Sequence, residues 1–445
     1  MNDAISEEDD IYEPSMLDDI EDIELYRPGG FHPVHIGDTF DNNRYLVIHK
    51  LGYGGFSTVW LCRDCHSNQY VAIKILTADE SSRSSNLELD TLLHLEHAPK
   101  ALSTHSGKQY VSSLLRNFTH ASMNGSHTCL VFQAAGPSIS MLVRGRSSRH
   151  GWIRGDIARA LAYQVTEGLA YIHLSGVGHG DLTTSNILVN IKRFHSLTQD
   201  ELYTVFGKPL KSKVEFISNH TQSLYSTSAP LYLVEPIDFS RVDPKHFSTE
   251  IQIVDFGQSF YLNKPPLDGL GTPMAYCAPE LIFDHTASVY SDVWALGCSV
   301  FEIRTGAPLF DAFFGSKKEI VSQMLNVIGK LPEPWWSAWK GDNENASEGG
   351  IYTLRDVITR AVGGSTDAGG GHPHTDNSNT IWSENPAISS DEVDIMKRFI
   401  EKLLIYKPEA RMSAEEASKQ PWISRTVLNY NVLQLLKVLD NDTRD

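Results

Sequence analysis

The sequence lacks long apolar runs and uses cysteine sparingly. No stretch of its 445 residues approaches the roughly 18 consecutive apolar positions that a membrane helix needs, so we expect no membrane span. The five cysteines are scattered, and only Cys62 and Cys65 form a C-x-x-C pair. No second Cys or His pair lies nearby to complete a zinc site, which favours ordinary strand and turn thiols. This cysteine usage is typical of a reduced cytosolic or nuclear setting.

Basic residues are missing from the start of the chain. Residues 1–25 contain eleven Asp and Glu residues and no Lys or Arg, so they carry −11 of the net charge of −17. Such a start is neither a secretory signal nor a basic transit peptide. The remaining residues carry only −6 and show no basic stripe, which disfavours a nucleic-acid partner. We predict an acidic, disordered tail at 1–25; the alternative is an internal decoy for basic substrates.

What is present is a strand-rich part followed by a helix-rich part. Apolar runs predict strands at 45–48, 59–62, 70–76 and 129–132, and helical spacing predicts a helix at 87–95. Later periodic segments predict helices at 157–173, 290–305, 320–328, 391–404 and 414–419. Residues 191–250 are interpreted as an insertion. Residues 341–388, rich in Gly, Ser, Asn and Asp, are interpreted as a flexible loop.

A glycine-rich stretch, LGYGGFSTV at 51–59, lies between two predicted strands. Gly52 and Gly54 match the first two glycines of the phosphate-binding pattern G-x-G-x-x-G-x-V, and Ser57 occupies the third position. Glycines allow backbone amides to approach phosphate closely. A helix after the glycines would suggest a dinucleotide-binding fold, whereas a strand is predicted here. Taken alone, the stretch is also compatible with an ordinary turn.

A lysine lies on the next apolar strand. The letters VAIK end at Lys74, fifteen residues after Val59. A lysine on a buried strand is costly unless it is paired. We therefore expect Lys74 to bind the α- and β-phosphates of a nucleotide and a carboxylate on the following helix. Glu88 is the candidate for that carboxylate, and Asp90 is the rival.

The segment HGDLTTSNIL at 179–188 matches the catalytic-loop pattern H-R-D-L-x-x-x-N. Its spacing lets Asp181 accept the proton of a substrate hydroxyl while Asn186 reaches Mg²⁺. Two positions depart from the pattern. Gly180 replaces the Arg that usually binds a phosphorylated activation loop, which predicts activity without that phosphorylation. Thr183 stands where most Ser/Thr kinases have a Lys near the γ-phosphate, which puts the rate in question.

Two more motifs follow in the expected order. An apolar strand ends in D-F-G at 255–257, where Asp255 is expected to bind Mg²⁺. The letters APE at 278–280 close the activation segment, and Arg411 is the expected partner of Glu280. A buried helix follows, with DVWALG at 292–297.

The motifs together predict a protein kinase that uses ATP and Mg²⁺. Their order and context argue against an α/β protein with coincidental matches. A pseudokinase is the more serious alternative. It would usually lack Lys74, Asp181 or Asp255, and all three are present.

The chain resembles the SR-protein kinase family, especially its fungal members, over residues 25–430. The resemblance is carried by ELYRPGGFHPVHIGD at 24–38, FSTVW at 56–60, EPIDF at 235–239 and GKLPEPWW at 329–336. It implies phosphorylation of serines in Arg-Ser repeats, chiefly of splicing factors, and an acidic docking groove. The insertion at 191–250 is similar to the family's spacer. Lys317 and Lys318 depart from the family, whose corresponding helix tends to begin with acidic residues.

These observations predict an α+β, two-lobed kinase fold at 26–430, with a β-rich lobe at about 40–133, a helical lobe at about 134–430 and a tail at 431–445. We expect Asp181, Lys74, Asn186 and Asp255 to be catalytic, the last two as metal ligands. The expected nucleotide-binding residues are Leu51, Gly52, Gly54, Ser57, Val59, Ala72, Lys74, Glu88, the gatekeeper Phe132, and Gln133 and Ala135 of the hinge.

The predicted activity is that of a serine/threonine protein kinase in mRNA processing. We expect a monomer in the cytoplasm and nucleus, with an Arg-Ser-rich protein substrate, no direct nucleic acid and no membrane. The alternative is a catalytically weak pseudokinase scaffold that binds Arg-rich partners.

Overall fold

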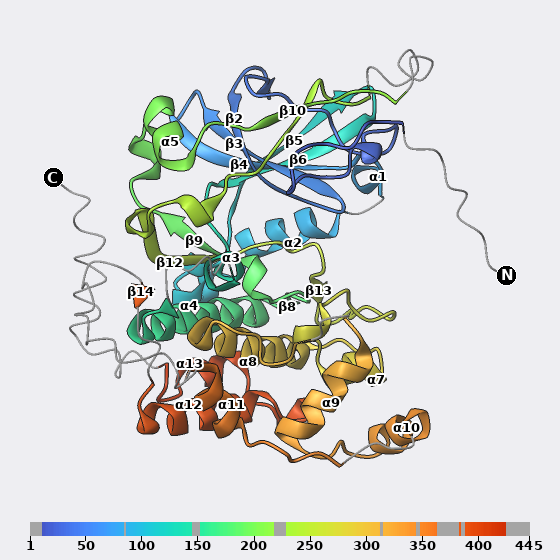
Figure 1. The fold of residues 1–445 in the computed structure, drawn as a ribbon, viewed down its shortest axis with the longest axis vertical. Coiled ribbons are helices and arrows are strands. Elements are labelled where there is room, and N and C mark those ends of the chain that lie inside the picture. Colours follow the sequence, from blue (N-terminus) through green and yellow to red (C-terminus); the bar gives the residue numbers. More distant parts are fainter. Residues whose placement is uncertain are drawn as a thin grey trace. The chain divides into compact units, whose positions relative to one another are not determined.

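The computed structural model describes residues 11–83, 86–144, 152–217, 228–311, 315–343, 348–362, 382–383 and 388–423. The chain forms two compact units, shown in Figure 1. The first unit combines 1–89, 113–134 and 193–242, and the second combines 90–112, 135–192 and 243–445. A β-sheet dominates the first unit and helices dominate the second, so the α+β prediction is confirmed. Among the described residues, no helix is both long and apolar enough to cross a membrane.

The first unit is built on a six-stranded antiparallel sheet in the order β1-β2-β3-β4-β6-β5. Its strands are β1 Thr39–Phe40, β2 Tyr45–Gly54, β3 Ser57–Asp64, β4 Gln69–Leu76, β5 Leu114–Ser122 and β6 Gly125–Gln133. The strands predicted at 45–48, 59–62, 70–76 and 129–132 all lie in this sheet, and the one predicted before D-F-G is β12 (Phe247–Ile253) of the second unit. We did not predict β5, because most of its side chains are exposed or only half-buried and it carries no apolar run.

The two faces of this sheet have different roles, because successive side chains of a strand point to opposite sides. One face forms the hydrophobic core, to which Trp60, Cys62 and Ile73 contribute. The other face carries most of the predicted nucleotide-binding side chains. Val59 lies opposite Lys74 in the β3–β4 pairing, and Ala72 lies opposite Phe132 in the β4–β6 pairing.

Part of the insertion belongs to the first unit. It forms helix α5 (Gln199–Phe206), which begins with a capping box between Thr198 and Glu201, and the hairpin of β10 (Lys211–Lys213) with β11 (Tyr232–Val234). His195 Nδ1 accepts a hydrogen bond from the Tyr70 amide at 3.1 Å. The Tyr203 hydroxyl donates to the Ile48 carbonyl at 3.0 Å. These bonds attach the insertion to β4 and β2.

The prediction of a disordered tail is wrong for residues 11–25. Tyr12 is 3% exposed and Glu21 is 2% exposed. The Glu13 amide donates to the Glu215 carbonyl at 2.9 Å, and the Tyr12 and Phe216 rings lie 4.9 Å apart. Ile20, Ile23 and Leu25 alternate with acids and pack on a hydrophobic cluster of the first unit, which a count of charges does not reveal. Residues 1–10 lie outside the described residues.

Helices are the main regular structure of the second unit. They are α3 (Ile139–Arg144), α4 (Gly155–Leu174), α7 (Pro279–Phe283), α8 (Val289–Thr305), α9 (Lys317–Ile328), α10 (Trp335–Asp342), α11 (Leu354–Val362), α12 (Ser390–Leu403) and α13 (Ala414–Ser418). Nearly every residue of α4 and α8 is buried, and the two helices lie next to each other in Figure 1. The predicted helices at 157–173, 290–305, 320–328, 391–404 and 414–419 correspond to α4, α8, α9, α12 and α13.

Short strands supplement these helices. β9 (Ile187–Ile191) pairs with β12 (Phe247–Ile253), and β8 (Val177–Gly178) pairs with β13 (Phe260–Tyr261). β7 (Trp152–Ile153) pairs with β14 (Trp382–Ser383). The β8–β13 and β9–β12 pairs frame the catalytic-loop motif and the D-F-G motif.

The flexible-loop prediction for 341–388 is wrong for residues 354–362. These form α11, whose Leu354, Ile358 and Val362 recur at helical spacing and are buried. The abundance of Gly, Ser and Asn around this helix hid its short periodic segment. Most of the remaining predicted loop and the predicted tail at 431–445 lie outside the described residues.

Candidate active site

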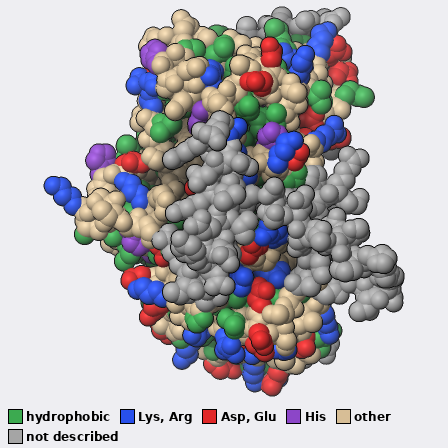
Figure 2. Space-filling view, turned by 90° about the vertical axis from the view of Figure 1, so that its left-hand side faces the viewer, with side chains coloured by type: hydrophobic (Ala, Val, Ile, Leu, Met, Phe, Trp, Pro, Cys, Tyr) green, Lys and Arg blue, Asp and Glu red, His purple; other side chains and the backbone are tan. Residues whose placement is uncertain are grey.

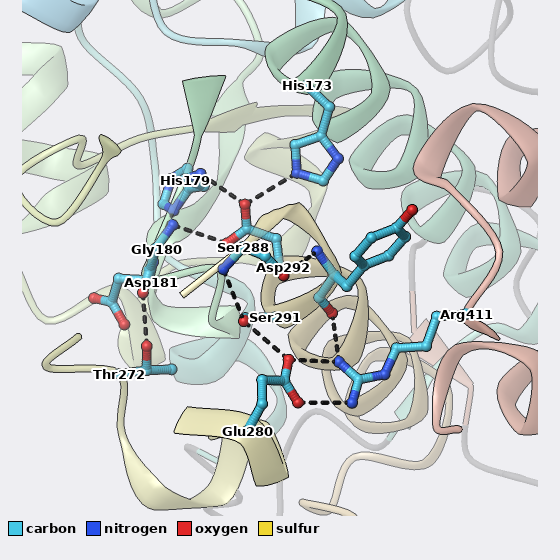
Figure 3. Close-up of polar contacts among 11 residues, drawn as sticks. His173, His179, Gly180, Asp181, Thr272, Glu280, Ser288, Ser291, Asp292 and Arg411 are labelled. Carbon is cyan, nitrogen blue, oxygen red and sulfur yellow. Dashed lines mark hydrogen bonds and ion pairs between the residues drawn. The ribbon is translucent and has the colours of Figure 1, made fainter. Parts of the chain in front are cut away.

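Asp292 anchors the backbone of the catalytic loop. This residue lies in the first turn of α8. Its carboxylate accepts hydrogen bonds from the amides of His179, at 2.7 Å, and Gly180, at 2.8 Å (Figure 3). His173 Nε2, from α4, lies 3.0 Å from the same carboxylate. An irregular loop needs such partners because its buried amides have no helix or sheet neighbours to bond.

The His179 ring joins the catalytic loop to the strand before D-F-G. Its Nδ1 accepts a hydrogen bond from the Asp181 amide at 3.2 Å, and its Nε2 lies 3.2 Å from the Val254 carbonyl. Both contacts are satisfied by a neutral ring with its proton on Nε2. Burial lowers the pKa of His179, which favours this neutral form.

Asp181 lies beside Asn186, and its environment increases its affinity for a proton. Asn186 Nδ2 donates to Asp181 Oδ2 at 2.8 Å. Burial, the largest cause, together with the charges of Asp255 and Asp292 and against the opposing bond from Asn186, raises the pKa of Asp181 to about 6. Asp181 Oδ1 is buried and has no hydrogen-bond partner among the described residues. A carboxylate with this pKa can exchange a proton near neutral pH.

Backbone pairing brings the D-F-G aspartate to the catalytic loop. Ile253 pairs with Ile187, and the Val254 amide donates to the Asn186 carbonyl at 2.9 Å. Asp255 follows directly, in a left-handed conformation with φ 66°, and its Oδ1 accepts from the Gly257 amide at 3.3 Å. Two carboxylates and one carboxamide therefore lie close together.

These oxygen groups are the donor type that Mg²⁺ prefers. The described residues contain no cluster of three or more His, Cys, Asp or Glu that could hold a metal by themselves. A metal bound only partly by protein is usual for Mg²⁺, which keeps waters and binds substrate phosphates. Asn186 and Asp255 fit that pattern.

Gly180 allows the activation segment to approach the catalytic loop. It has φ 80°, and a Cβ built on it would lie 2.1 Å from the Gln258 carbonyl oxygen. An Arg side chain is therefore incompatible with this backbone. The Thr272 hydroxyl donates to the Gly180 carbonyl at 2.7 Å (Figure 3), and the Gly271 amide donates to Gln258 Oε1 at 3.2 Å. Direct bonds hold the segment here without a phosphate. Thr183, the other departure, is buried.

The pairing predicted between Glu280 and Arg411 is present. The guanidinium makes two hydrogen bonds with the carboxylate, at 2.7 and 2.8 Å, and both side chains are buried (Figure 3). The Ser291 hydroxyl donates to Glu280 at 2.9 Å. Because Ser291 and Asp292 are neighbours on α8, one helix start supports both the end of the activation segment and the catalytic loop.

Lys74 pairs with Glu88, as expected, and not with the rival Asp90. In the first unit, the Lys74 ammonium lies 2.9 and 2.8 Å from the two carboxylate oxygens of Glu88. Asp90 is exposed. The pair satisfies the lysine on its strand, where an unpaired charge would be costly.

The glycine-rich stretch forms the hairpin between β2 and β3. Gly52 pairs with Val59, and Gly54 pairs with Ser57. A Cβ added to Gly52 or Gly54 would meet no atom within 4 Å, so protein packing does not require glycine there. Glycines at these positions leave the backbone open to close approach by a ligand.

The other predicted nucleotide-binding side chains are placed as follows. Leu51, Val59 and Phe132 are half-buried in the sheet of the first unit, and Ala72 is largely buried there. Gln133, at the end of β6, is exposed. Ala135 is buried and belongs to the second unit.

Sequence reasoning missed the residues that support the catalytic loop. Asp292 was noted only as part of the helix that follows A-P-E, and Gln258 was not noted. The available signal for Asp292 was an acid in the first turn of an otherwise apolar helix, which needs a buried partner. No pattern in the sequence indicated Gln258.

Comparison with known proteins agrees with this geometry. A model of the protein kinase domain matches residues 45–199 and 242–423, so the break in the match falls within the insertion. The protein kinase dsk1 of Schizosaccharomyces pombe is 24% identical over 91% of this chain and 85% of its own length. The serine/threonine-protein kinase SRPK of Physarum polycephalum is 27% identical over 91% of each chain.

A shorter match is stronger in identity. The serine/threonine-protein kinase spk-1 of Caenorhabditis elegans is 39% identical over 39% of this chain and 17% of its own length. The domain match covers most of the chain, and two of these relatives, SRPK and spk-1, are named as serine/threonine-protein kinases. The chain therefore belongs to the protein kinase family and is a serine/threonine protein kinase of the SR-protein kinase family.

Proposed function

We propose that this kinase uses Mg·ATP to phosphorylate serines in Arg-Ser-rich proteins, with Asp181 as the residue that accepts the substrate proton. Protein kinases use ATP with a divalent metal ion. The observation that carries the proposal is the juxtaposition of Asp181, Asn186 and Asp255 in one small polar cluster. A carboxylate with a raised pKa beside two metal-type oxygen groups suits phosphoryl transfer.

The proposed roles follow from this arrangement. Asp181 accepts the proton as the substrate oxygen bonds to the γ-phosphorus and the bond from that phosphorus to the β,γ-bridging oxygen breaks, releasing ADP. Asn186 and Asp255 hold Mg²⁺, which neutralises charge on the transferred group when it is bound. Lys74, held by Glu88, donates to the α- and β-phosphates. The protein acts by positioning and electrostatics.

The preference for Arg-Ser sequences is supported by the membership of the SR-protein kinase family. Lys317, at the start of α9, looked unfavourable for binding a basic peptide. Its ammonium lies 3.3 Å from the Ile282 carbonyl and 4.6 Å from the centre of the Phe283 ring. Its charge is thus directed partly toward the end of α7. On the face shown in Figure 2, acidic and basic side chains are interspersed.

The test compares two peptides that differ only in their cation. An alternating Arg-Ser peptide and a Lys-Ser peptide are assayed at several salt concentrations, with Asp181→Asn as the inactive control. We expect much higher kcat/KM for Arg-Ser, because a guanidinium binds carboxylates through two bonds and an ammonium does not. The preference should weaken with salt. Equal use of both peptides would refute the Arg-Ser assignment. Binding without any phosphate transfer would refute the catalytic roles.

A further inference from the structure

Two acidic residues near the start of the chain contact the base of the glycine-rich hairpin. Glu21 forms an ion pair with Lys50, and the two side chains are 2% and 0% exposed. Lys50 lies on β2, directly before Leu51 and Gly52. This pair was not predicted, because residues 1–25 were assigned to a solvated tail.

The second acid reaches into the hairpin itself. The Tyr53 hydroxyl, between Gly52 and Gly54, donates to Asp19 Oδ1 at 3.1 Å. The Lys50 ammonium lies 5.3 Å from the centre of the Tyr53 ring, within the range of a cation–π contact. Tyr53 is therefore held by one contact from the N-terminal segment and by another from the lysine that this segment neutralises.

The N-terminal segment, residues 11–31, is itself fixed to the first unit. The Tyr26 hydroxyl donates to the Glu21 carboxylate, and the Tyr26 ring lies 5.6 Å from that of Phe31. Both rings pack with Leu233 of β11 in a small hydrophobic cluster. The acids thus project from a packed support, which gives their contacts with the hairpin a defined geometry.

The buried lysine makes this arrangement sensitive to the loss of Glu21. Burial lowers the pKa of Lys50, and the charge of Asp19 opposes that shift. An ammonium with no exposed surface needs a carboxylate nearby, and removing only one partner of such a pair is far more disruptive than removing both. If Lys50 moves, the backbone of Leu51, Gly52 and Tyr53 will move with it, because these residues follow it directly on β2.

We propose that Asp19 and Glu21 are positioning residues that hold the glycine-rich hairpin in the conformation that binds the ATP phosphates. The inference rests on the proposed function, which assigns ATP phosphates to this hairpin. Glycines leave the hairpin many backbone conformations, and ordering it on ATP binding is unfavourable in entropy. Contacts that restrict the hairpin beforehand reduce this loss and lower the KM for ATP.

The test uses Glu21→Gln in the full-length chain. This substitution keeps the size of the side chain and removes its charge. We expect the KM for ATP to rise about five- to tenfold, with kcat and the KM for peptide within about twofold of wild type. Adding Lys50→Met should restore much of the ATP affinity, because it removes the unpaired cation. Asp19→Asn should give a smaller rise in the same parameter.

Asp18→Asn is the matched control, since Asp18 is an exposed neighbour with the same charge. It should leave the KM for ATP unchanged. Melting temperatures and nucleotide-analogue affinities are measured for each variant, well below its unfolding temperature. If Glu21→Gln and Asp19→Asn lower only the melting temperature, the residues are merely structural and the inference is wrong. A rise in the peptide KM alone would overturn it equally.

Failure of the inference and failure of the proposed function give different results. If wild-type turnover is abolished by Asp181→Asn while the KM for ATP is insensitive to Glu21→Gln, only the positioning role is refuted. If turnover survives Asp181→Asn, the proposed catalytic site is refuted whatever the Glu21 variants show.

Discussion

Each of the two units contains a buried ion pair. The two pairs are similarly buried, but their cations make different contacts. In the second unit, Arg411 makes two bonds to Glu280 and donates further bonds to the carbonyls of Tyr290, Ile405 and Tyr406. In the first unit, Lys50 has the carboxylate of Glu21 and the faces of two aromatic rings. The planar guanidinium fixes several groups in direction, whereas an ammonium acts as a point charge.

This difference suits the parts of the molecule that the pairs support. The Arg411–Glu280 pair holds the end of the activation segment against α8, whose Asp292 holds the catalytic loop. That structure has to keep reacting groups in place. The Glu21–Lys50 pair supports a hairpin of glycines that has to adapt to a nucleotide. A less directional contact permits small adjustments there.

Breaking the directional pair should have the largest effect. Arg411→Met leaves the Glu280 carboxylate buried without its partner, and we expect the free energy of unfolding to fall by about 3–5 kcal/mol. The double variant Arg411→Met with Glu280→Leu should recover a large part of this loss. Denaturant unfolding of the three proteins measures the effect. A loss below 1 kcal/mol for the single variant would show that the pair contributes little.

The next effect concerns the loop that this network supports. Asp181→Asn should lower kcat by roughly two orders of magnitude or more, because the proton acceptor is lost. Asp255→Asn should be similarly damaging through the loss of a metal ligand. Mg²⁺-dependent initial rates at saturating ATP are the measurement. Full activity in both variants would show that the reacting site lies elsewhere.

A third polar cluster, in the first unit, consists of three histidines. The centre of the His32 ring lies 4.7 Å from the ring centre of His120 and 5.1 Å from that of His127. Burial, together with the neighbouring histidines, lowers the pKa of His32 from 6.5 to about 3, and Asp38 opposes the shift. His32 Nδ1 is buried with no hydrogen-bond partner among the described residues.

This cluster should make the first unit sensitive to acid. A depressed folded-state pKa stabilises the fold above the unfolded pKa of about 6.5, and the contribution is lost as pH falls from there toward the folded value. For His32 we expect a loss of about 2 kcal/mol between pH 7 and pH 5. His32→Phe should flatten the pH dependence of unfolding, whereas the exposed control His66→Gln should not. Identical slopes in all three proteins would contradict the prediction.

The smallest expected effect concerns phosphorylation of the activation segment. Thr272 is buried and its hydroxyl already bonds the Gly180 carbonyl, so no basic side chain is needed to order the segment. Phosphatase treatment should therefore change the initial rate by less than about twofold, since no phosphate–guanidinium contact exists at residue 180 to be lost. A large loss of rate that returns when Thr272 is rephosphorylated would refute this.

Much of the site was predictable because its chemistry is local in the sequence. The patterns around Lys74, Asp181 and Asp255 each specify a strand or loop and a reacting group within a few residues. The sequence narrowed the partner of Lys74 to Glu88 or Asp90. A helical period of 3.6 residues places only one of these two toward the strand. The structure was needed to decide which one.

The two wrong predictions, for residues 11–25 and for α11, have a common physical origin. Residues 11–25 were predicted to be disordered because of their acidic charge, yet Tyr12 is buried through contacts with residues about 200 positions away. α11 was hidden by the glycine-rich composition on either side of it. Both segments gain stability from burial against the rest of their unit, which local composition does not record.

Local patterns were enough to predict a kinase with a sheet-rich and a helix-rich part, because strand periodicity, helix periodicity and motif spacing are properties of neighbouring residues. The folded arrangement was needed to identify the carboxylate that neutralises Lys50, the acid that holds the catalytic loop and the reason for glycine at position 180. Those answers depend on atoms brought together from distant segments, where desolvation makes each buried charge or amide require a partner that proximity along the chain does not specify.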